Sequence, residues 1–106
     1  MDERIKHCFV EMDKLENLLK ESKIEYIRDI NIKKVLPDLL NGKYAPVRNQ
    51  IILNRNNRNI CSVICHYGSY GVNDGLLEFW DFKNEAQGFL NAKEAFELIK
   101  KSLERR

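Results

Sequence analysis

Cys61, Cys65 and His66 follow one another closely and carry side chains that can ligate a metal or form a nucleophile–base pair. The spacing argues against both uses in a strand. Residues four apart are separated by about 13 Å, and adjacent side chains point to opposite faces. We therefore expect Cys61 and Cys65 to be buried structural thiols, as well as Cys8, which lies on an apolar helical stripe. No metal and no cofactor are expected.

His66 also stands where an apolar segment opens into a glycine-rich loop, a common position for functional groups. Its candidate partners are Asp74, across the loop, and Glu78, on the segment that follows. A nearby carboxylate would favour the charged ring or orient a neutral ring as a base. Ser69 is the one candidate nucleophile, and no catalytic motif surrounds it. We expect His66 to anchor the loop through hydrogen bonds, with a catalytic role as the alternative.

The loop between Gly68 and Gly75 contains three glycines, which let a backbone turn tightly or approach a partner closely. Phosphate-binding loops need a helix directly after the glycines, whereas a strand is expected here. Tyr, Ser and Asn beside glycine are typical of protein-binding loops. The candidate partner-binding residues are Tyr67, Ser69, Tyr70, Asn73 and Asp74, with His66, Glu78 and Trp80 in support. The alternative for the loop is a connection without a role.

Trp80 and Phe82 share one face of the last predicted strand. A place in the core is expected for both, because large aromatic side chains usually lie there. A partly exposed Trp80 would instead be an interface anchor.

Two amphipathic helices are predicted at the ends of the chain. Apolar residues recur every three or four positions over residues 3–22 and again over residues 91–103. Asn91 followed by Glu94 matches a capping box at the start of the second helix.

Four apolar segments predict strands, at residues 24–32, 47–54, 59–67 and 76–82. Asn56 and Asn57 are expected to form a hairpin turn, because Asn tolerates a positive φ. Residues 35–40 fit a single helical turn or a loop, and residues 83–88 fit a loop. We predict one α+β domain over residues 1–106. In it, the N- and C-terminal helices pack on a three- to four-stranded antiparallel β-meander.

The composition is that of one folded domain of 106 residues with a net charge of +2. This charge is too small to indicate a nucleic-acid partner, although Arg48, Arg55 and Arg58 with Tyr67 and Tyr70 leave an RNA-binding accessory role as a weaker alternative. No apolar run approaches 18 residues, so no membrane span is expected. The absence of a secretion signal and the odd number of cysteines predict a cytoplasmic protein.

Two segments, residues 66–82 and residues 88–101, resemble a group of small uncharacterised proteins of phages and prophages of Firmicutes. The residues that carry the resemblance are Gly68-Ser69-Tyr70-Gly71, Gly75-Leu76-Leu77-Glu78 and Gly88-Phe89-Leu90. The resemblance implies an origin in a mobile element, and it implies no particular activity.

These observations lead to the hypothesis of a non-enzymatic protein that binds a host protein, for example an anti-CRISPR-like inhibitor of a defence nuclease. The alternative is a small nucleotide- or ligand-binding protein or enzyme that uses loop 68–75 with His66, Asp74 and Glu78. An exposed sheet edge could also support a homodimer.

Overall fold

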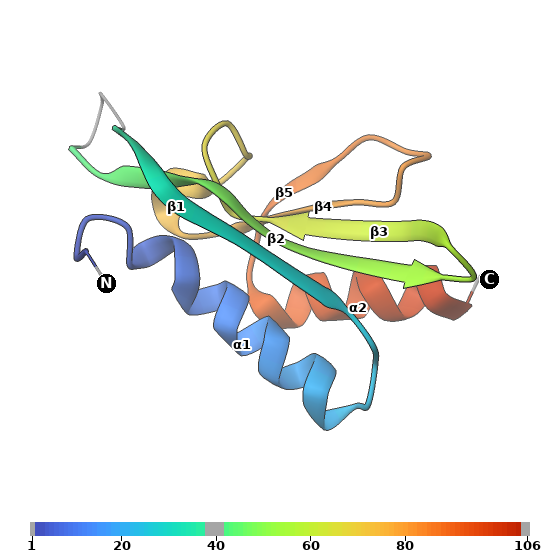
Figure 1. Cartoon of the computed structure of the whole chain (residues 1–106). Helices are drawn as coiled ribbons and strands as arrows, with labels where there is room; N and C mark the ends of the chain where they lie inside the picture. Colours follow the sequence, from blue (N-terminus) through green and yellow to red (C-terminus); the bar gives the residue numbers. More distant parts are fainter. Residues whose placement is uncertain (1, 38–41, 105–106) are drawn as a thin grey trace.

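Two helices lie on one face of an antiparallel β-sheet, so the fold is α+β as predicted (Figure 1). The structure is a computed structural model that describes residues 2–37 and 42–104, and for residues 34–36 the backbone only. The described residues form five strands in the order β1-β2-β3-β4-β5, each antiparallel to the next. The elements are α1 (His7–Glu21), β1 (Ile27–Pro37), β2 (Tyr44–Arg55), β3 (Arg58–Ile64), the 3-10 helix η1 (Val72–Asp74), β4 (Leu77–Trp80), β5 (Gln87–Leu90) and α2 (Ala92–Glu104).

The predicted number of strands, three to four, is wrong because β5 adds a fifth strand to the described part of the sheet. The sequence predicts a loop over residues 83–88, whereas β5 begins at Gln87. The side chains of this strand are exposed or half-buried, and Gly88 lies within it, so it carries little of the usual strand pattern. Its pairing with β4 is also irregular between Leu77 and Phe79.

Strand β1 is longer than predicted and extends to Pro37. The helical turn or loop expected from residue 35 is therefore wrong for residues 35–37, and its remainder, residues 38–40, lies outside the described residues. The pairing with β2 is irregular between Asn31 and Val35, which breaks the alternation on which the prediction relied. Proline fits here because β1 is at the edge of the sheet.

Two local predictions are confirmed. Asn56 and Asn57 have φ values of 53° and 63° and turn the chain between β2 and β3. Asn91 caps α2, because its Oδ1 accepts the Glu94 N–H at 2.8 Å while the Glu94 carboxylate accepts the Asn91 N–H at 2.9 Å.

The core lies between the helices and the sheet. Each helix buries one stripe of side chains against the sheet. Every second side chain is buried in β4 and, from Asn49 to Leu53, in β2, whereas β3 buries four in succession, from Ile60 to Val63. The largest apolar side chains that are fully buried include Ile5, Met12, Leu15, Leu19, Ile51, Leu53, Val63, Leu77 and Ile99. Burying each such side chain contributes about 1.5–3 kcal/mol.

The helices cover only one face of the sheet, and the opposite face is called the open face below (Figure 1). Paired residues on adjacent strands point to the same face. Ile51, Val63 and Phe79 form one such row and are buried under the helices. The neighbouring row therefore lies on the open face and consists of Ile27, Ile52, Ser62 and Trp80.

Candidate functional site

The loop after β3 is fixed to the start of β2 by backbone hydrogen bonds. The Cys65 N–H donates to the Asn49 carbonyl and the Tyr67 N–H to the Pro46 carbonyl, both at 3.0 Å. Figure 1 shows that this loop and the connection between β4 and β5 rise from the sheet on the side opposite the helices. The predicted site residues are therefore held on an ordered backbone.

Ser69 has a structural role within this loop. Its Oγ accepts the His66 N–H at 3.1 Å and donates to the His66 carbonyl at 2.8 Å, and the residue is buried. A serine hydroxyl engaged in this way closes a turn. It is not placed as a nucleophile or as a contact for a partner.

His66 is half-buried, and its Nδ1 accepts the backbone N–H of Asn49 at 3.2 Å. Burial lowers the pKa of His66, while the charge of Glu78 acts in the opposite direction and that of Arg48 lowers it further. Because Nδ1 accepts this N–H, the ring carries its proton on Nε2 in this arrangement. This is the anchoring role expected from the sequence.

Glu78 and Asp74, the other two members of the alternative site, form no hydrogen bond with His66 in the described part of the chain. The Glu78 carboxylate accepts the Tyr70 N–H at 2.9 Å. The Asp74 carboxylate is exposed and makes no hydrogen bond or ion pair with the residues that the structure describes. No catalytic geometry links these three side chains in the described part of the chain.

The glycines serve close packing of the loop on its neighbours. A Cβ on Gly75 would lie 2.5 Å from the His7 carbonyl oxygen, and one on Gly88 would lie 2.2 Å from the Tyr70 Cβ. Neither position has space for a side chain. Glycine at position 75 therefore lets the loop pack against α1, and glycine at position 88 lets β5 pack against the loop.

Five aromatic side chains are exposed near the open face. The exposed fractions are 60% for Tyr67, Tyr70 and Phe89, 41% for Trp80 and 38% for Phe82. We call these five residues the aromatic surface. The expectation that Trp80 and Phe82 lie in the core is wrong, because the open face on which Trp80 stands has no helix over it.

The β4–β5 connection is held in a defined shape. The Trp80 and Phe82 ring centroids are 4.5 Å apart, and the Trp80 Nε1–H donates to the Asn84 carbonyl at 2.8 Å. Asp81 accepts the N–H groups of Asn84 and Lys83, and these bonds lower the pKa of Asp81 to about 2. The Trp80–Phe82 pair is therefore presented by an ordered turn.

Phe82 and Phe89 have positive φ values of 66° and 58°. Bulky residues rarely adopt this conformation, and nothing in the residue types predicts it. Phe89 is not among the site residues expected from the sequence. The adjacent Gly88 was the one available signal, because glycine within a strand often marks a bulge.

A second polar cluster lies under α1 and has a structural role. The Asn49 amide nitrogen donates to the carbonyls of Cys8 and Cys65 at 2.7 and 3.2 Å, and its oxygen accepts Arg28 Nη2 at 3.0 Å. Arg28 Nη1 in turn bonds Glu16 at 3.0 Å. These contacts join α1 to β1 and β2. The interruption of an apolar strand by Arg28 was the sequence signal for this cluster.

All three cysteines are buried and take part in no disulfide in the described structure, as expected for structural thiols. A hydrogen bond with Cys8 and burial raise the pKa of the Cys65 thiol. Within residues 2–37 and 42–104, no three His, Cys, Asp or Glu side chains meet in a way that could hold a metal ion.

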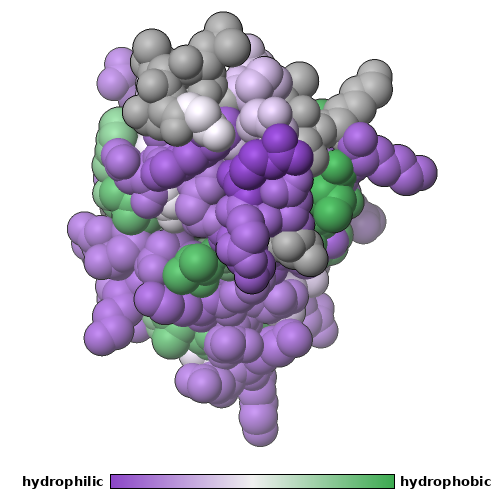
Figure 2. All heavy atoms as spheres, turned by 90° about the vertical axis from the view of Figure 1, so that its left-hand side faces the viewer, coloured by the Kyte–Doolittle hydropathy of each residue, from purple (hydrophilic) through white to green (hydrophobic). Residues whose placement is uncertain are grey.

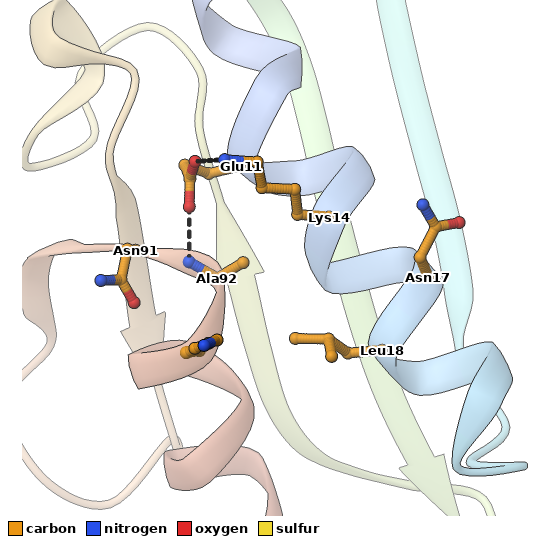
Figure 3. A pocket seen from close by; sticks show the side chains of 7 residues that line it. Glu11, Lys14, Asn17, Leu18, Asn91 and Ala92 are labelled. Carbon is orange, nitrogen blue, oxygen red and sulfur yellow. Dashed lines mark hydrogen bonds and ion pairs between the residues drawn. The ribbon is translucent and has the colours of Figure 1, made fainter.

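A groove of about 490 Å³ separates α1 from the start of α2 (Figure 3). Its central contact is the Glu11 carboxylate, which accepts the Ala92 N–H at 2.8 Å and pairs with Lys14 at 3.0 Å. The first bond lowers the pKa of Glu11. The hydrogen bond from Ala92 to Glu11 joins the two helices across the groove. Because Glu11 occupies the N-terminus of α2, the groove presents no free anion site.

The end of the molecule that faces the viewer in Figure 2 differs from the open face. Its surface is mostly hydrophilic, and the hydrophobic side chains visible there are separated from one another. No helix among the described residues is long and apolar enough to cross a membrane.

Comparison with known proteins gave no match to a family model, to a curated protein or to a solved structure.

Proposed function

We propose that this protein acts by binding another protein through the aromatic surface. The observation that carries the proposal is the exposure of five aromatic side chains on ordered backbone near the open face. Contiguous exposed apolar groups mark interaction sites. Tyr and Trp are also enriched among the residues that dominate binding energy.

Further apolar side chains beside the aromatic surface support this role. Ile27 is exposed and Ile52 is half-buried in the same row as Trp80. An ion pair of 3.2 Å between Arg48 and Asp29 lies on the next part of the open face. An apolar centre with a polar rim is the usual anatomy of a protein interface.

We infer that the partner is a protein of the host cell, with a defence nuclease as one specific case. This part of the proposal is supported by the resemblance of residues 66–82 and 88–101 to phage and prophage proteins. The absence of a disulfide among Cys8, Cys61 and Cys65 in the described structure supports action in a reducing compartment such as the cytoplasm. The ligand-binding alternative has less support, because His66 Nδ1 and one carboxylate oxygen of Glu78 already accept backbone N–H groups.

Affinity capture from a lysate of the bacterial host tests this proposal, with the tagged protein as bait. We expect one protein to be captured in stoichiometric amount by the wild type and lost with the Tyr67→Ala/Tyr70→Ala variant. Alanine keeps the Tyr70 Cβ that packs on Gly88, so the fold is preserved. Val10→Ala is the matched control, since Val10 is an exposed apolar residue of α1. Equal capture by both variants would contradict the proposal.

A further inference from the structure

We propose that the cleft between η1 and β5 receives a positively charged side chain of the partner, Arg or Lys. This inference rests on the proposed function and adds the chemistry of the partner. The cleft has a volume of about 260 Å³ and is lined by residues 69–74 and Phe89. Tyr70 and Phe89, which are exposed to the same extent, both line it.

The backbone that carries Tyr70 and Phe89 is fixed before any ligand arrives. The Phe89 N–H donates to the Tyr70 carbonyl at 3.4 Å, and the Tyr70 N–H donates to the Glu78 carboxylate at 2.9 Å. The absence of a side chain on Gly88 lets the two segments approach this closely. A backbone that is already ordered loses little entropy on binding.

The backbone conformation of Phe89 also supports a binding role for this cleft. Its φ of 58° is rare for a bulky residue, yet its ring is exposed and so gains little from burial in this protein. Strain of this kind is concentrated at ligand clamps and other functional sites.

The charge of the cleft favours a cation. Asp74 lines it, and its carboxylate forms no hydrogen bond or ion pair with another described residue. Lys43 is the neighbouring cation, and its Nζ donates to the Asn73 carbonyl at 2.8 Å, which shows that this end of η1 accepts an ammonium group. Ring faces and a carboxylate attract Lys and Arg together, and the planar guanidinium of Arg also stacks on rings.

The same groups disfavour a nucleic acid. Bases stack on exposed aromatic side chains, but such sites pair the rings with Lys or Arg that follow the phosphates. The residues that line this cleft include no Lys or Arg, and the carboxylate of Asp74 would repel a phosphate.

The test is a titration of the full ¹⁵N-labelled chain, followed by NMR, with blocked tripeptides Gly-Arg-Gly, Gly-Lys-Gly and Gly-Gln-Gly. We expect the Arg and Lys peptides, at up to tens of millimolar, to shift the amide signals of residues 69–74 and 89. The Gln peptide should shift them far less. Asp74→Asn should lower the affinity for the Arg peptide about two- to fivefold. Glu85→Gln, a matched change on the exposed β4–β5 connection, should leave binding unaltered.

Three results would overturn the inference: equal shifts with the Gln peptide, no effect of Asp74→Asn, or no shift in the cleft with any peptide. A uridine oligonucleotide that shifts these signals where the peptides do not would also overturn it and favour RNA. A result in which the peptides cause no shift while Tyr67→Ala/Tyr70→Ala still abolishes capture of the partner would support the proposed function and contradict the cation site.

Discussion

At the scale of single residues, Phe82 and Phe89 combine two unfavourable features. Each holds a positive φ and each exposes its ring. A backbone conformation of this kind costs about 1–3 kcal/mol in a non-glycine residue. The surrounding hydrogen bonds maintain it, and the result is a set of rings directed to solvent by an ordered backbone.

Replacing Phe89 by Gly and by Ala separates the backbone strain from the ring. Both variants remove the ring, but Ala keeps a Cβ at positive φ, whereas Gly adopts this conformation freely. We expect Phe89→Gly to be more stable than Phe89→Ala by about 1 kcal/mol in chemical denaturation. Equal stability of the two variants would show that position 89 is unstrained in solution.

The residue types predicted part of this site. The positive φ of Asn56 and Asn57 and the burial of the thiols could be predicted, because both follow from the residue type alone. The positive φ of Phe89 could not be predicted, because it depends on the close contact between Gly88 and Tyr70, residues far apart in the sequence.

At the scale of elements, the start of α2 is fixed by two separate acceptors. Asn91 caps it from within, and Glu11 reaches it from α1 (Figure 3). The second contact ties the two helices that together cover the core side of the sheet.

Glu11→Ala should lower the free energy of unfolding by about 1 kcal/mol, because the Ala92 N–H loses its acceptor. Since folding lowers the pKa of Glu11 from its ordinary value of 4.5, its charge stabilises the fold above that pH. This stabilisation is lost as the pH falls through the folded pKa. The difference between variant and wild type in urea denaturation should therefore shrink in acid.

Glu21→Ala is the control, since Glu21 is exposed at the other end of α1. Its stability should match or slightly exceed that of the wild type, because an acid is unfavourable at a helix C-terminus. An undiminished effect of Glu11→Ala in acid would contradict a role for the carboxylate charge.

The elements with a strong pattern were predictable, and those without one were not. Both helices, the β2–β3 hairpin and β4 follow from apolar periodicity. β5 was missed because four exposed or half-buried residues give no alternation, and the extension of β1 was missed because the chain bulges after Asn31. Pairing with a neighbouring strand defines both segments, and that information lies elsewhere in the chain.

At the scale of the whole molecule, the two sides of the sheet have different tasks. The helix side contains the core and the polar cluster of Asn49 and Arg28. The open side carries the aromatic surface, presented by the loop after β3 and the β4–β5 connection. One side therefore stabilises the fold, and we propose that the other binds the partner.

Hydrogen–deuterium exchange on the protein alone and in complex with its captured partner tests this division most directly. We expect binding to slow exchange in residues 66–75 and 77–90, while α1 and α2 remain unchanged. Protection confined to the groove between α1 and α2, around Glu11 and Asn91, would contradict the account and place the interface on the helix side.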